Sequence, residues 1–325
     1  MNIFVGTEGL TAEFAKTAPP PKVFEDSDFP ILLRIKNKGA QSIAKEEKGS
    51  FASGGLLSIG REKDYVKSLS LEQEGRIIRG NTDNEVIFFV DGKTQINPKG
   101  DEIVVTLNAK TGKLDPQSEQ KLSNTITATL CYPYKTVLST TVCIDPDIAG
   151  TRPGKKVCSV KELVFGGGQG APIAVTKIEP QMIPKGDKVI KPQFLIYIEN
   201  KGQGNPVNIF DFRNVCRKDA LTEQAVKNTW NVAFLKAYKS GKEGEDQNQL
   251  ECTPKLEKYV PYSEADVDKV GFIRLRDKKD FVRCTFKEEI PRNSDAYTSP
   301  LRIDIYYGYV QTVSTNFLIQ KPLRY

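Results

Sequence analysis

The 325-residue sequence contains no histidine, and this absence removes several kinds of chemistry. A chain without imidazole cannot form a Ser-His-Asp triad, a Cys-His nucleophile or a histidine-containing metal site. Carboxylates are present, but neighbours such as Glu46-Glu47 and Glu288-Glu289 would point to opposite faces of a strand. There is no Gly-x-Ser-x-Gly motif either. The sequence therefore offers no catalytic residues and no cofactor motif, and we expect a protein that is not an enzyme.

Other features are also scarce. The chain has two methionines and one tryptophan, and no apolar run approaches the roughly 18 residues that span a membrane. Its 47 lysines and arginines are interleaved with 41 acidic residues rather than gathered in a basic patch, so we expect no nucleic-acid partner. The short apolar start lacks the basic flank of a signal peptide. Contact with a membrane is expected only through an N-terminal anchor that has been removed.

A duplication is the strongest organisational signal in the chain. Two strand-like segments, 29–39 and 194–202, end in the same Asn-Lys-Gly turn, with an offset of 163 residues between Asn37 and Asn200. A second pair of similar segments, 126–144 and 301–319, follows in the same order with an offset of 175 residues (134 to 309). Two motifs in the same order and at nearly the same offset indicate that one domain has been duplicated.

The second pair of segments alternates between apolar and polar residues, which predicts half-buried strands. The residues on one face are Ile126, Ala128, Leu130, Tyr132 and Tyr134 in the first copy, and Ile303, Ile305, Tyr307 and Tyr309 in the second. Each copy is expected to end in an antiparallel hairpin, with its loop at 135–138 or 310–313. The tyrosines could form a platform for sugar stacking, but their position on the inward face favours core packing.

We predict an all-β protein with two tandem immunoglobulin-like antiparallel β-sandwiches, at 1–145 and 171–325. A Pro/Gly-rich linker at 146–170 joins them. Its run Gly166–Gly170 precedes a strand rather than a helix, which indicates a flexible hinge instead of a phosphate-binding loop. Apolar residues at 226, 230, 233, 234 and 237 have helical spacing. They predict a helical insertion in the second sandwich near 219–239.

Six cysteines without a CxxC pair predict disulfides in an oxidising compartment rather than a zinc site. They are Cys131, Cys143, Cys158, Cys216, Cys252 and Cys284. In a hairpin centred on residue 137, Cys131 and Cys143 would face each other, so we pair these first. Strand-like surroundings favour Cys252 with Cys284, which leaves Cys158 with Cys216. Other pairings, and scattered thiols in a cytosolic protein, are the alternatives.

Asp145 and Asp147, with Glu162 nearby, come closest to a calcium site. Calcium requires several oxygen ligands, and this spacing matches no EF-hand loop. Two acidic residues beside a proline are more typical of an ordinary loop. We therefore predict no metal.

The repeat resembles a known family. Gly9-Leu-Thr-Ala-Glu-Phe14 with Ala18-Pro-Pro-Pro21, and the two Asn-Lys-Gly turns, resemble CARDB-type immunoglobulin-like modules of prokaryotic surface proteins. The block Cys131-Tyr-Pro-Tyr134 with Gly168-Gln-Gly-Ala-Pro172 is similar to uncharacterised archaeal envelope proteins with tandem modules. The resemblance implies the fold and a setting outside the cytoplasm, and it brings no catalytic residues.

These observations predict a structural or adhesive protein that is extracellular or on the cell surface. The short apolar segment Asn2, Ile3, Phe4, Val5 could add as a strand to the sheet edge of a neighbouring copy and so build a filament or sheath. The expected partners are other copies of the chain or other surface proteins. A monomeric surface module that recognises glycan or protein is the alternative. A carboxylate glycosidase is a third candidate, for which no paired motif is visible.

Overall fold

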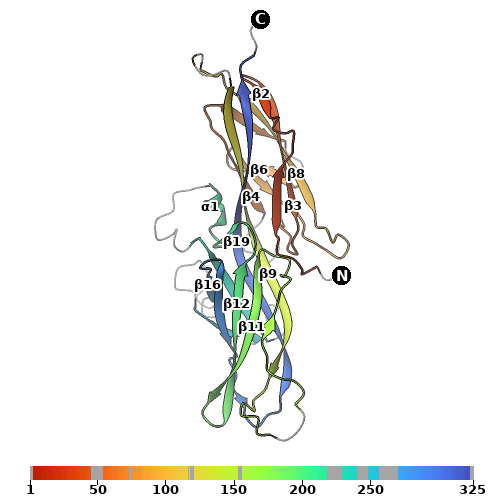
Figure 1. Ribbon diagram of the computed structural model, residues 1–325, viewed down its shortest axis with the longest axis vertical. Coiled ribbons are helices and arrows are strands. Elements are labelled where there is room, and N and C mark those ends of the chain that lie inside the picture. The colour runs from red at the N-terminus through yellow and green to blue at the C-terminus, as the bar shows by residue number, and fades with distance from the viewer. Residues whose placement is uncertain are drawn as a thin grey trace.

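The computed structural model describes residues 3–44, 54–72, 75–115, 117, 121–152, 156–217, 229–239, 248–255 and 270–322. Figure 1 shows an elongated molecule with two lobes stacked along its long axis. We call the lobe that carries β1 to β8 the first lobe, and the lobe that carries β10 to β18 the second lobe. Nearly all of the described secondary structure is β, which confirms the predicted class.

The first lobe contains two sheets. One has the order β1-β3-β8-β5, and the other contains β4, β7 and β6 together with the short parallel strand β2. Their bounds are β1 Leu10–Phe14, β2 Lys22–Phe24, β3 Asp28–Asn37, β4 Gly55–Gly60, β5 Val66–Leu71, β6 Ile77–Arg79, β7 Glu85–Phe88 and β8 Glu102–Thr111.

The second lobe is built in a similar way. One sheet has the order β10-β11-β12-β17-β15, with β18 beside β12, and the other contains β14, β16 and β13. Their bounds are β10 Leu163–Val164, β11 Ile173–Lys185, β12 Val189–Asn200, β13 Asn205–Val207, α1 Phe212–Arg217, β14 Val232–Tyr238, β15 Glu251–Thr253, β16 Gly271–Arg274, β17 Lys279–Thr285 and β18 Ile290–Pro291.

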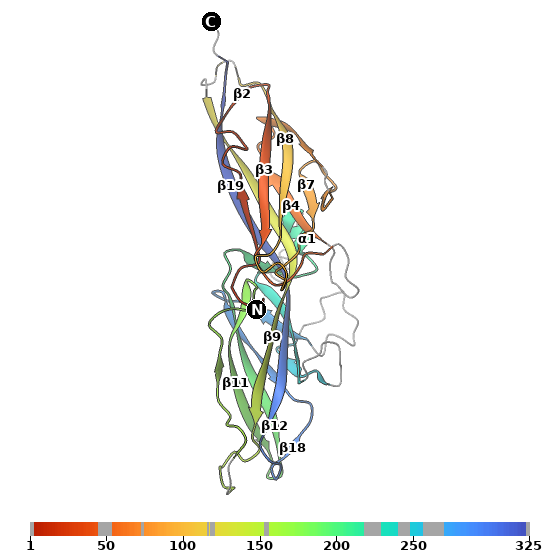
Figure 2. The same ribbon diagram turned by 90° about the vertical axis from the view of Figure 1, so that its right-hand side faces the viewer.

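Two long strands run through both lobes (Figures 1 and 2). β9 (Lys121–Ile144) and β19 (Tyr297–Gln320) are each 24 residues long and pair antiparallel along their whole length. β9 lies beside β4 in the first lobe, whereas β19 lies beside β14 in the second. Each strand therefore extends from its own copy into the other, and each lobe is completed by a strand from the other copy.

The predicted hairpins are therefore wrong. The proposed loops at 135–138 and 310–313 contain Lys-Thr-Val-Leu and Val-Gln-Thr-Val, with no glycine, proline or asparagine to make a turn. The inward residues also keep one parity on both sides of each proposed loop, as a straight strand requires. They are Tyr134 and Val142 in β9, and Tyr309 and Phe317 in β19.

The long strands of the two copies are centred on equivalent residues. Pro133 of β9 lies opposite Gly308 of β19, and these residues are 175 positions apart, which is the offset of the sequence repeat. The duplicated segments therefore pair with each other about a local two-fold axis at the junction of the lobes. The division at 145 and 171 stays a sequence-based description of the two copies, since both long strands contribute to both lobes.

The helix predicted near 219–239 is wrong where the structure describes it. Val232–Tyr238 forms strand β14, and all but one of its residues are buried. A strand covered on both faces is apolar on both faces, so it lacks the alternation that distinguishes a strand from a helix in the sequence. The described helix, α1, lies earlier, at Phe212–Arg217, and residues 218–228 are outside the described part of the chain.

The glycine-rich part of the linker is not a free hinge. The Gly6 amide donates to the Gly167 carbonyl (2.9 Å), and the Gly170 amide donates to the Gly6 carbonyl (2.8 Å). The Ala40 amide in turn donates to the Gly170 carbonyl (2.8 Å). Gly170 has a positive φ of 69°, and a Cβ there would crowd Ala40, which explains the glycine. The loop therefore fastens the linker to the first lobe.

The cysteine pairs differ from expectation in two of three cases. The Cys252–Cys284 bond between β15 and β17 is confirmed. The other bonds are Cys131–Cys216 and Cys143–Cys158, so the predicted 131–143 and 158–216 pairs are wrong. Without a hairpin, Cys131 and Cys143 are 12 residues apart on one straight strand, roughly 40 Å, which no disulfide can span.

Candidate functional site

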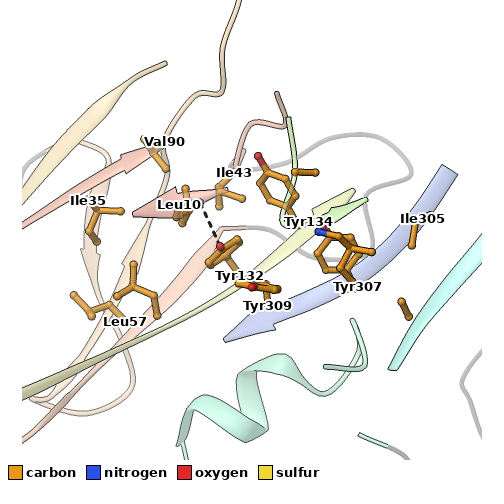
Figure 3. Packing of buried hydrophobic residues seen from close by; sticks show 14 of the residues in the cluster. Leu10, Ile35, Ile43, Leu57, Val90, Tyr132, Tyr134, Ile305, Tyr307 and Tyr309 are labelled. Carbon is orange, nitrogen blue, oxygen red and sulfur yellow. Dashed lines mark hydrogen bonds between the residues drawn. The ribbon is translucent and has the colours of Figure 1, made fainter. Parts of the chain in front are cut away.

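Four tyrosines lie buried at the middle of the β9–β19 pair, at the junction of the two lobes (Figure 3). The Tyr132 ring centroid is 5.8 Å from that of Tyr309, and the Tyr134 centroid is 6.1 Å from that of Tyr307. Each pair contains one tyrosine from each copy. The cluster has no exposed ring face. The prediction that these tyrosines pack in the core is therefore confirmed, and stacking of a sugar on them is excluded.

The tyrosine hydroxyls explain the repeated Asn-Lys-Gly turns. The Gln41 amide donates to the Tyr134 hydroxyl (3.4 Å), and the Tyr309 hydroxyl donates to the Asn200 side-chain oxygen (3.1 Å). A Cβ at Gly39 or Gly202 would overlap the hydroxyl of Tyr134 or Tyr309, respectively. Each turn therefore provides a glycine that leaves room for a tyrosine of the adjoining long strand.

The first strands of the two copies contact the other two hydroxyls. The Leu10 amide donates to the Tyr132 hydroxyl (3.3 Å), and the Ile173 amide donates to the Tyr307 hydroxyl (3.4 Å). Burial raises the pKa of all four tyrosines, with that of Tyr309 raised to about 12. The phenols are therefore held neutral and act as hydrogen-bonding groups of the core.

The opposite side of the junction is closed by α1 of the second copy. Its Phe212, Val215 and Cys216 pack against Leu56 and Cys131 of the first copy. The Cys131–Cys216 disulfide joins this helix covalently to β9. No local pattern in the sequence marked this contact, because it joins residues 85 positions apart.

An ion pair adds to this contact beside α1. The Arg217 Nε lies 3.1 Å from Oε1 of Glu85, whose side chain is nearly buried in β7. The lobes are thus held on one side by the tyrosine cluster and on the other by the helix, its disulfide and this ion pair.

A second buried ionic group joins the two long strands. Asp304 of β19 is fully buried and lies 3.2 Å from Nζ of Lys135 in β9. The Arg302 Nε lies 2.9 Å from its other carboxylate oxygen. A buried carboxylate needs such partners because desolvation would otherwise destabilise the charge. Lys135 thus joins β9 to β19, whereas Arg302 neutralises the carboxylate from within β19.

The acidic residues considered for calcium are bound to a lysine. The Lys156 ammonium lies 2.6 Å from Asp145 and 3.1 Å from Asp147, in the loop that follows β9. Hydrogen bonds to Asp145 and then Asp147 raise the pKa of Lys156. Glu162 is not part of this group and instead lies 4.0 Å from Lys177. The carboxylates surround a side-chain ammonium, and the described residues contain no cluster of potential metal ligands.

The expected assembly segment lies at the junction. Asn2 is outside the described residues, whereas Ile3, Phe4 and Val5 are described and belong to no strand. Phe4 is 45% exposed and Val5 is 47% exposed. The Lys93 ammonium donates to the Val5 carbonyl (3.4 Å). Two apolar side chains are thus presented to solvent next to the glycine-rich loop.

Comparisons with known proteins assign no family to this chain. No family model matches the sequence, and the search of curated proteins found no match. Among solved structures, the chain is aligned with the C-terminal domain of the Streptococcus pyogenes antigen I/II-family protein AspA at 12% identity and a TM-score of 0.21. The alignment covers 98% of this chain and 100% of that one. A likeness at this TM-score carries no argument about fold or function. No helix of the described residues is long and apolar enough to cross a membrane.

Proposed function

We propose that the protein is a non-enzymatic structural protein of the cell surface, the subunit of a filament or sheath whose copies join by strand addition. The observation that carries this proposal is the unbroken pair β9 and β19. Twenty-four paired residues extend roughly 80 Å, through both lobes. A two-strand spine of this length makes a rod without a hinge, which suits a structural element.

Two further observations support the proposal. The junction is fixed from opposite sides by the tyrosine cluster and by α1, so neither lobe can bend freely against the other. All six cysteines are paired, as in proteins that fold in oxidising compartments, which favours a place outside the cytoplasm. The immunoglobulin-like, CARDB-like character of the lobes belongs to the same proposal, since each lobe consists of two sheets with a shared core.

Deletion of residues 1–8 is expected to abolish assembly. The full-length protein should form polymers visible by electron microscopy, whereas the deleted protein should elute as a monomer in size-exclusion chromatography. Phe4→Ser with Val5→Ser should have the same effect because it removes the two exposed apolar side chains. Phe24→Ser is the matched control, since Phe24 is similarly exposed (49%) but lies in β2. Polymers of unchanged length from the deleted protein would contradict the proposal.

A second candidate function is a monomeric surface module that binds glycan or protein. It is favoured by Tyr197 and Phe281 on the outer face of β12 and β17, whose ring centroids are 5.7 Å apart. Phe281 is 47% exposed, and the Tyr197 hydroxyl donates to Glu179 (3.0 Å). Exposed aromatic residues beside polar groups are common in binding surfaces. A monodisperse monomer that binds a glycan array, and loses binding in Phe281→Ala, would favour this function over the first.

A further inference from the structure

Part of the β9 edge pairs with no described strand. β4 pairs with β9 only from Thr127 to Cys131, and β19 occupies the other side. Within the part of the chain that the structure describes, no strand lies beside Tyr132–Ile144 on the side away from β19. An open edge presents unpaired backbone N–H and C=O groups, which can accept another strand.

The first lobe closes the last residues of the equivalent edge with a strand, whereas the described residues of the second lobe do not. In the first lobe, β2 pairs in parallel with Leu318–Gln320 at the end of β19. The repeat offset of 175 places Leu318 and Ile319 at Cys143 and Ile144 of β9. In the second lobe, the corresponding part of the chain is the continuation of β11, which stays paired with β12 as far as Lys185. Among the described residues, no strand of the second lobe thus takes the position that β2 takes in the first.

Proline positions identify the backbone groups that face this edge. Proline has no N–H, so a proline in a ladder has its nitrogen directed away from the paired strand. Pro133 of β9 and Pro300 of β19 both lie in the β9–β19 ladder, opposite Gly308 and Thr141, respectively. The odd-numbered residues of β9 therefore direct their N–H and C=O groups toward the open edge. Between the junction and the end of the strand these include Val137, Ser139, Thr141 and Cys143.

The residues of this edge strand carry none of the features that usually protect a strand against strand addition. Thr136–Ile144 contains no charge, no proline and no glycine, and most of its residues favour strands. The neighbouring edge of β11 differs, because Pro180 and Pro184 lie in the part of that strand beyond its pairing with β10. Natural edge strands are normally blocked by prolines, charges or a covering segment. Prolines block the edge of β11 in this way, whereas Thr136–Ile144 of β9 is uncharged and pairs with no described strand on the side away from β19.

A hollow of about 300 Å³ lies at the end of this edge. It is lined by Thr141, Val142, Cys143 and Thr298 of the two long strands and by Cys158, Ser159, Lys161 and Leu163 of the segment before β11. The Cys143–Cys158 disulfide joins that segment to β9. No backbone hydrogen bond joins the described residues 156–162 to β9. The linker therefore borders the edge without filling its ladder.

We propose that the edge Thr136–Ile144 of β9 is the acceptor for a strand from a second copy of this chain, and that the donor is the segment Ile3–Val5. This inference rests on the proposed function and names its acceptor. The donor is apolar and uncharged, belongs to no strand, and has two half-exposed side chains. Because donor and acceptor are different surfaces, the contact is head-to-tail, and such contacts build a filament when their rotation does not close a ring.

A labelled peptide of residues 1–5, added to the full chain that lacks those residues and keeps Gly6, tests the acceptor directly. Fluorescence anisotropy should show binding. Ser139→Pro with Thr141→Pro should weaken it at least about tenfold, because two edge N–H donors are lost. Ser314→Pro with Asn316→Pro is the matched control, since these residues are equivalent in the first lobe and also exposed on β19. Ser139→Lys with Thr141→Lys is a second edge variant in case the prolines impair folding.

The outcomes separate this inference from the proposed function. Absence of peptide binding, or equal binding to the truncated chain with and without the edge substitutions, would overturn the acceptor assignment even if polymers form. Loss of binding in the Ser314/Asn316 control alone would assign the acceptor to β19 instead. Mixing the chain that lacks residues 1–5 with the Ser139→Pro, Thr141→Pro chain should give a one-to-one dimer and nothing longer. Peptide binding without any polymerisation of the full chain would retain the acceptor and reject the filament.

Discussion

Replacing Tyr134 with alanine is expected to lower the free energy of unfolding by about 4 kcal/mol. Tyr134 is 2% exposed, packs against Tyr307 of the other copy, and accepts a hydrogen bond from the Gln41 amide. The substitution leaves a cavity at the junction and an unpaired amide beside it. Chemical denaturation followed by circular dichroism measures the loss.

Two controls define the cause of this loss. Tyr134→Phe retains the ring and should cost only about 1–2 kcal/mol, the value of the hydroxyl contacts. Tyr309→Ala removes the repeat-equivalent residue, and its cost should be similar because Tyr309 occupies the same place in the second copy. A cost below about 1 kcal/mol for Tyr134→Ala would show that the junction is not a packed core.

The protein is expected to lose its stability steeply above about pH 10. In the unfolded chain, tyrosine loses its proton near pH 10. In the folded chain, burial raises the pKa of Tyr132, Tyr134, Tyr307 and Tyr309, and Tyr309 loses its proton only at about 12. Below pH 10 both states hold the protons, so the stability is fully present. Above it the unfolded state releases protons first, and the stability falls as pH rises toward the folded pKa values.

The expected slope is up to about 1.4 kcal/mol per pH unit for each buried tyrosine. Four such residues would unfold a typical domain within about two pH units. Tyrosinate absorbance and circular dichroism, recorded together, measure the effect. At least these four of the 12 tyrosines should ionise only as the fold is lost. Ionisation of all of them near pH 10, with native circular dichroism retained, would contradict the burial of the cluster.

Sequence patterns predicted the duplication and the presence of strands. They did not predict that each long strand continues from one lobe into the other. The alternation in 126–144 and 301–319 correctly placed Tyr132 and Tyr309 on an inward face. Whether a strand turns back or continues into another lobe depends on partners that are far away in sequence. The absence of turn residues at 135–138, and the constant parity on both sides, were the available signals. Both favour the straight strand that the structure contains.

The remaining differences have the same physical origin. Val232–Tyr238 is buried on both faces, and a short apolar run of this kind cannot be distinguished from part of a helix by periodicity. The Cys131–Cys216 bond joins β9 to a helix of the other copy, so it depends on how the copies are placed in space. The Cys252–Cys284 pair was predictable because both residues lie in adjacent strands of one sheet.

The central claim is that β9 and β19 make the two lobes one cooperative unit. Native-state hydrogen exchange, measured by mass spectrometry on wild type and on Ile31→Ala, tests it most directly. Ile31 is fully buried in β3 of the first lobe, and its truncation should cost about 3 kcal/mol. We expect amides of β12 in the second lobe to lose protection by the same free energy as those of β3. Unchanged protection in β12, with protection lost only in the first lobe, would contradict it.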